Sequence, residues 1–110
     1  MIIIPFEDRL PDVEAEIKFN KTRNRGVISG YRPGHKIMDG YITSGVHNYY
    51  FVDKVMPGET AIGTITFITP EEYPNTLWIG KEIDICEGER IVGSALITKI
   101  FNPTLRRSED

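Results

Sequence analysis

The residues best able to hold a metal ion in this sequence are two histidines and one cysteine. His35 and His47 stand in separate segments, and Cys86 lies between the acidic neighbours Asp84 and Glu87. No two of these potential ligands show the spacing of a recognised metal site. We therefore expect no metal centre, and we interpret both histidines as partly exposed loop residues.

Covalent and nucleotide chemistry find little support in the residue pattern. Carboxylates beside Cys86 favour a raised thiol pKa, so we interpret Cys86 as a structural cysteine rather than a nucleophile. The glycine-containing run 26–30 lacks the lysine and hydroxyl pair of a P-loop. Acidic pairs such as Glu71 and Glu72 are interpreted as solvated side chains. We expect no enzymatic activity, no cofactor and no bound nucleotide.

Basic residues cluster in sequence around one tyrosine. Arginines interleaved with aromatic residues are typical of surfaces that dock RNA, and solvated loops are the alternative interpretation. A formal net charge of −3 argues against bulk electrostatic capture of nucleic acid or of a membrane surface. Arg23 belongs to this basic cluster. The residues of the RNA-binding hypothesis are Arg25, Tyr31, Arg32, Lys36 and Arg90.

Two aromatic stretches provide the candidates for protein binding. Neighbouring members of the run 49–51 must face opposite sides of a strand, so at least one of them should reach the surface. Exposed tyrosine and tryptophan side chains mark protein interfaces, whereas the alternative is that they cover the end of the fold. The residues of this hypothesis are Tyr49, Tyr50, Phe51, Tyr73 and Trp78.

The elements that must position these residues are β-strands. The 110-residue chain has 16 isoleucines but only 4 leucines and 3 alanines, a bias that favours strands over long helices. Strict alternation over 12–19 and 81–86 indicates half-buried strands. The further expectations are short strands at 27–28 and 49–52, a strand over 36–43 with a bulge at Gly40, a loop over 44–48, a central strand over 61–69, irregular chain over 70–75, and the longest strand over 91–100.

Four motifs in order give the chain a family resemblance. They are the strand over 12–19, Gly30-Tyr31-Arg32-Pro33, Val55-Met56-Pro57-Gly58-Glu59 and the run 87–95. Together they resemble the C-terminal (third) β-barrel domain of elongation factor Tu, a translational GTPase. The resemblance covers about 12–100 and implies one domain over 1–110, with flanking segments 1–11 and 101–110. The implied fold is all-β, a closed six-stranded antiparallel Greek-key barrel, standing without a GTP-binding domain.

The resemblance also implies partners. In the family this barrel contacts the backbone of the tRNA T-stem and packs on other proteins. The tRNA-facing positions correspond here to Gly34-His35 and to the turn 86–90. Cys86 stands where the family has an arginine, and Glu89 where it has a glycine, so a cation is lost and a carboxylate is gained beside phosphates.

These observations predict a non-enzymatic, cytoplasmic protein that acts by protein–protein contact. The N-terminus has no basic region ahead of an apolar one, as a secretion signal would require. We expect another protein as the partner, a toxin or a translation component, so that the chain would be an immunity or antitoxin-like protein or a mimic of a translation factor. The alternative hypothesis is a translation-associated accessory that binds tRNA.

Overall fold

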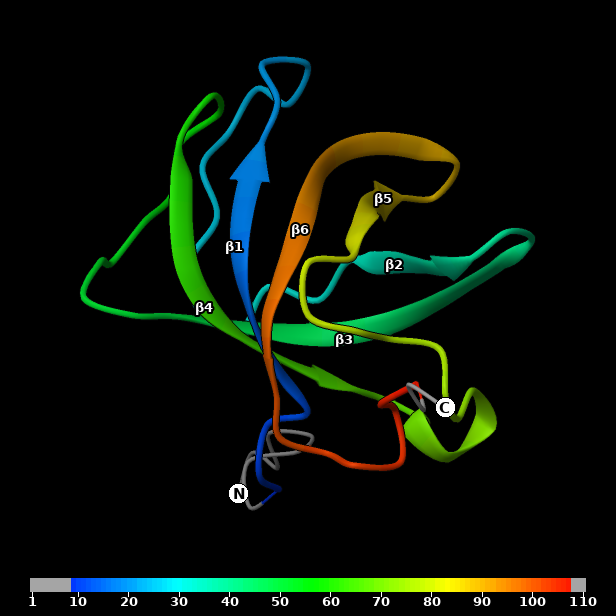
Figure 1. The fold of residues 1–110 in the computed structure, drawn as a ribbon. Coiled ribbons are helices and arrows are strands. Elements are labelled where there is room, and N and C mark those ends of the chain that lie inside the picture. Colours follow the sequence, from blue (N-terminus) through cyan, green and yellow to red (C-terminus); the bar gives the residue numbers. More distant parts are fainter. Residues whose placement is uncertain (1–8, 108–110) are drawn as a thin grey trace, which may run out of the picture.

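Six antiparallel strands close into a barrel in the computed structural model, which describes residues 9–107 (Figure 1). Around the barrel the strands follow the order β1-β4-β3-β2-β5-β6, and β6 pairs with β1. Because β2, β3 and β4 are consecutive neighbours and β1 lies beside β4, the connection is a Greek key. The expected fold class is confirmed. The elements are β1 (Val13–Phe19), β2 (Gly34–Met38), β3 (Tyr41–Tyr49), β4 (Thr60–Phe67), the 3₁₀ helix η1 (Pro70–Glu72), β5 (Glu82–Glu87) and β6 (Arg90–Ile100).

Alternation along the strands builds the core as the sequence predicts. Every second residue of β1 is buried, from Val13 to Phe19, whereas Glu16 and Lys18 face solvent. In β5, Ile83 and Ile85 point into the barrel. These two strands are therefore half-buried, with one face toward a single apolar core and one toward water.

The region around β2 and β3 differs from the expectation. The predicted strand over 36–43 is a hairpin: Asp39 and Gly40 form its turn, and Gly40 has a φ of 77°. Of the two turn residues only Gly40 takes a positive φ, a conformation that glycine adopts without steric cost. The register shift lies between Lys36 and Met38 rather than at Gly40. The predicted loop over 44–48 is wrong as well, since these residues continue β3 beside β4.

Three other local predictions are corrected. The aromatic strand over 49–52 is wrong, because β3 ends at Tyr49 and the chain bends at Tyr50 and Phe51. The short strand at 27–28 is a single bridge between Val27 and Val55. The run 70–75 contains η1 instead of being entirely irregular.

The described parts of the flanking segments pack on the barrel. The Asp12 carboxylate accepts hydrogen bonds from the backbone N–H of Phe67 (2.7 Å) and from Asn102 Nδ2 (2.9 Å), so it joins the start of β1 to the ends of β4 and β6. Leu105 is fully buried in the core. Residues 1–8 and 108–110 of those segments lie outside the described residues. Within residues 9–107, no helix has the length and apolar character needed to cross a bilayer.

Candidate functional site

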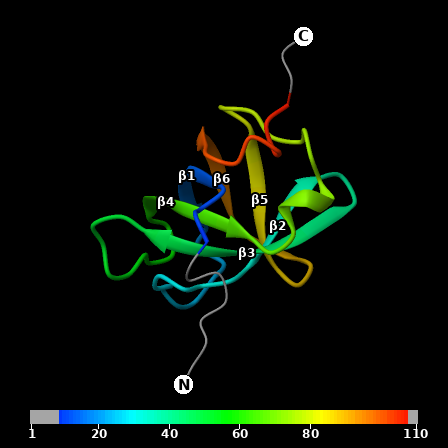
Figure 2. The same cartoon turned by 90° about the horizontal axis from the view of Figure 1, so that it is seen from below.

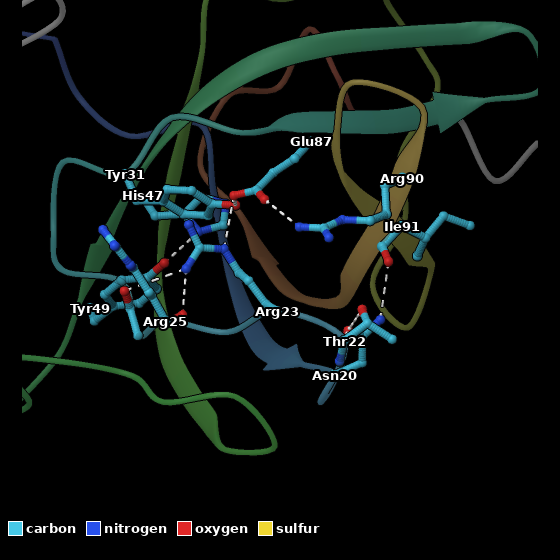
Figure 3. Close-up of polar contacts among 11 residues, drawn as sticks. Asn20, Thr22, Arg23, Arg25, Tyr31, His47, Tyr49, Glu87, Arg90 and Ile91 are labelled. Atoms are coloured by element: carbon cyan, nitrogen blue, oxygen red, sulfur yellow. Dashed lines mark hydrogen bonds and ion pairs between the residues drawn. The ribbon is translucent and has the colours of Figure 1, made fainter.

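The Glu87 carboxylate is the shared hydrogen-bond acceptor of a polar corner, where the loop after β1 meets the β5–β6 turn (Figure 3). Glu87 Oε2 accepts hydrogen bonds from Arg23 Nε (2.8 Å) and from the Tyr31 hydroxyl (2.6 Å). Its second oxygen, Oε1, accepts one from Arg90 Nη2 (3.2 Å). The Arg23 guanidinium also lies 5.1 Å from the centre of the Tyr31 ring. We call these four residues the Glu87 corner.

The corner borders a hollow of about 200 Å³ lined by Arg23, Asn24, Arg25, Glu87 and Arg90. The structure thus brings together two members of the predicted RNA-binding set, Arg25 and Arg90, beside Tyr31 of the same set. The other two members lie elsewhere. Arg32 is exposed just before β2, and Lys36 lies on β2 opposite Asp84 of β5.

The carboxylate of Glu87 compensates part of the positive charge of the Glu87 corner. The hydrogen bond from Tyr31 and the neighbouring Arg23 guanidinium hold the pKa of the Glu87 carboxyl below its usual range. Glu87 therefore stays ionised at neutral pH and offsets part of the positive charge of Arg23 and Arg90. A phosphate entering the hollow would meet this carboxylate as well as the guanidinium groups.

Two histidines interpreted as loop residues lie at the centre of the barrel, so that interpretation was wrong. His35 on β2 and His47 on β3 are both fully buried. Each stands at an inward position of its strand, and their Nε2 atoms are 2.7 Å apart. This is a hydrogen-bond distance, shorter than the separation of roughly 3.3 Å between two nitrogens on one tetrahedral zinc.

Their partners assign the tautomers of both imidazoles. The Tyr49 hydroxyl donates to His47 Nδ1 (2.8 Å), His47 Nε2–H donates to His35 Nε2, and His35 Nδ1–H donates to the backbone oxygen of Thr43 (3.2 Å). Every nitrogen is satisfied while both rings are neutral. Burial lowers the pKa of His35 to about 4, and burial together with His35 lowers the pKa of His47 well below its ordinary value.

The cysteine fits its structural interpretation. Cys86 is buried on β5, and burial, followed by the nearby Asp84 carboxylate, raises the pKa of its thiol. Among residues 9–107, no group of three or more histidine, cysteine, aspartate or glutamate side chains is placed to hold a metal ion.

The aromatic candidates divide between core and surface. Tyr49 is buried beside His47, and Tyr73 is buried against Phe67, with its hydroxyl 3.1 Å from Thr43 Oγ1. These two tyrosines belong to the core and are not available to a partner. Tyr50 is half-buried, whereas Phe51 is fully exposed and Trp78 is 37% exposed.

Phe51 lies on a segment that is tied to a second one, a pairing that the sequence pattern did not reveal. The segment between β3 and β4 stands clear of the barrel in both views (Figures 1 and 2), and the Val27–Val55 bridge ties it to the segment after β1. In this antiparallel bridge Gly26 lies close to the Met56 thioether. The two bridged segments carry four exposed apolar side chains, which together we call the loop surface: Ile28, Phe51, Val52 and Met56.

Phe51 is unusual in its backbone as well as its exposure. Its φ is 63°, in the left-handed region that disfavours side chains larger than those of glycine, asparagine and aspartate. A phenylalanine here faces water and also holds a disfavoured conformation. Neither property helps the isolated fold, which marks Phe51 as a functional candidate.

The fold defines the chain as a closed Greek-key β-barrel that carries a polar corner and an apolar loop surface. No protein-family model matches the sequence. The relationship to the third domain of elongation factor Tu therefore remains a prediction from the four motifs.

Proposed function

We propose that this protein is a non-enzymatic binding protein whose barrel is a scaffold and whose loop surface docks on another protein. The observation that carries the proposal is Phe51, a fully exposed aromatic side chain held at positive φ on a protruding segment. Ile28, Val52 and Met56 are further exposed apolar side chains on the two bridged segments. Aromatic side chains flanked by apolar neighbours are the usual energetic centre of a protein interface.

The charge of the chain supports a partner of opposite sign. The sequence carries a net charge of −3, and complementary charge speeds association and favours the right partner. The proposed partner is thus a basic protein with an apolar pocket for Phe51. A toxin neutralised by an immunity protein fits this description, as does a translation component in the cytoplasm that recognises a barrel of the elongation factor type.

The alternative function is binding of tRNA by a translation-associated accessory protein. The hollow that collects Arg23, Arg25 and Arg90 favours it. Against it stands Glu87, which pairs with Arg23 and Arg90 and lies in the same hollow. We therefore rank protein binding above RNA binding.

Site-specific photocrosslinking tests the proposal. A photoreactive phenylalanine analogue replaces Phe51 in one variant and Phe101 in a control, since both side chains are exposed aromatics on irregular segments. In host lysate we expect one protein adduct at position 51 that is absent at position 101. Adducts to RNA instead, or the same adducts at both positions, would contradict the proposal.

A further inference from the structure

A second surface forms where the chain between η1 and β5 lies beside the chain that follows β6 (Figures 1 and 2). Leu77 and Arg106 form a parallel bridge. The backbone N–H of Leu77 donates to Leu105 O (2.9 Å), and that of Arg107 donates to Leu77 O (2.7 Å). These hydrogen bonds hold Trp78, which follows Leu77, beside Arg107, which follows Arg106.

Three cationic side chains lie around Trp78: Lys81, Arg106 and Arg107. Arg107 Cζ lies 4.2 Å from the centre of the Trp78 ring, and Lys81 Nζ lies 4.6 Å from it. Lys81 is held there because its ammonium group donates to the backbone oxygens of Ile37 (2.7 Å) and Thr76 (2.8 Å). Arg106 lines a hollow of about 220 Å³ together with Trp78, Ile79 and Arg107. We call this group the Trp78 cluster.

Among residues 9–107, no side-chain ion pair compensates the positive charge of the Trp78 cluster. The side-chain ion pairs within residues 9–107 involve the carboxylates of Asp12 and Glu87, and none of them includes Lys81, Arg106 or Arg107. Burial, followed by the charge of Arg107, lowers the pKa of Lys81, and Asp39 offsets this only in part. A local excess of like charge on a chain of net charge −3 is therefore a place where an anion gains energy.

We propose that the Trp78 cluster binds an acidic peptide segment of a partner protein. Carboxylates of the segment pair with Arg106 and Arg107, because guanidinium groups match carboxylates with two parallel hydrogen bonds. The ammonium group of Lys81 attracts them as a point charge. An apolar side chain of the segment packs on Ile79, which is exposed beside them. This surface does not include the loop surface, so either proposal can fail without the other.

A peptide fits the cluster better than a nucleic acid does. Single-stranded nucleic acids are bound mainly by stacking their bases on exposed aromatic rings. Here the Trp78 ring already contacts two cations of the protein itself. The ring therefore holds Lys81 and Arg107 in place, and a ligand meets the positive charge of these side chains.

The chain contains its own reporter for this site, because Trp78 is its single tryptophan. We would titrate the protein with a short synthetic peptide that alternates glutamate and leucine, and follow tryptophan emission at about 50 mM and about 300 mM NaCl. The expected result is a saturable change in emission that weakens at the higher salt concentration. Arg106→Gln and Arg107→Gln should each weaken binding about tenfold, as expected for a lost charge-assisted hydrogen bond.

The matched control is Arg25→Gln, which removes the same charge from an exposed position that lines the hollow beside the Glu87 corner. It should bind the peptide as the wild type does, and circular dichroism should show the same fold for all variants. An emission that stays unchanged at low salt overturns the proposal. Equal weakening by Arg25→Gln also overturns it, as does tighter binding of a single-stranded RNA of the same charge to the wild type.

Discussion

The buried histidine pair predicts that the barrel loses stability as the pH falls from about 7 to about 5. Burial keeps His35 and His47 neutral in the folded state, with the pKa of His35 lowered to about 4. In the unfolded chain both imidazoles take up protons near pH 6.5. The unfolded state then holds more protons than the folded state, so the free energy of unfolding decreases as the pH falls through this window.

The pKa of His35 determines the expected magnitude. At pH 5 an unfolded histidine is almost fully protonated, whereas His35 in the folded barrel is mostly neutral. The difference lowers the free energy of unfolding by about 2 kcal/mol between pH 7 and pH 5. His47 changes it in the same direction. The sequence has only these two histidines, and most carboxyl groups titrate at lower pH.

Urea unfolding followed by circular dichroism at a series of pH values measures this loss. The variant His35→Gln should show a smaller dependence on pH, because one of the two groups is gone. If that variant does not fold, NMR of the wild type provides a second test, since neither imidazole should titrate near pH 6.5 in the folded protein. An unfolding free energy that is equal at pH 7 and pH 5 would refute the reasoning, and so would ordinary imidazole titration.

Three further predictions concern packing and reactivity. Gly93→Ala should lower the free energy of unfolding by about 2 kcal/mol in urea unfolding, because its Cβ would lie 2.3 Å from the backbone oxygen of Lys18. The neighbouring control Ser94→Ala should change this free energy by less than about 0.5 kcal/mol. Asp12→Ala should cost about 2 kcal/mol or more in the same assay, because it removes the acceptor of two hydrogen bonds from buried or half-buried groups; a near-wild-type value would contradict the role of Asp12. Cys86 should react with a thiol reagent at neutral pH far more slowly in the folded than in the unfolded protein, and equal rates would show that the thiol is accessible.

The sequence predicts the strands whose two faces differ clearly in polarity. In β1, charged residues alternate with Val13, Ala15, Ile17 and Phe19, so the period of two is plain. Around β3 the same period is hidden, because the inward positions hold Thr43, Gly45, His47 and Tyr49. Polar residue types at these positions are typical of a loop. Their burial is explained only by the side chains that they contact inside the barrel, such as His35 for His47.

The candidate sites were predicted less completely for a related reason. The basic cluster in the sequence includes Arg23, but the sequence does not show that Glu87 neutralises it from a strand that lies far along the chain. Phe51 was identified as an aromatic candidate, whereas the Val27–Val55 bridge that ties its segment to the segment after β1 depends on how two loops pair. Long-range pairing of this kind leaves no local pattern in the residues.

The most direct test of the proposed function is the affinity of Phe51→Asn for the protein that crosslinks at position 51. Asparagine tolerates positive φ, so this substitution should raise the free energy of unfolding by about 1 kcal/mol while removing the aromatic contact. By calorimetric titration we expect about tenfold weaker binding or more, and wild-type affinity for the control Phe101→Asn. Wild-type affinity of a stably folded Phe51→Asn variant would contradict the proposal that the loop surface binds the partner.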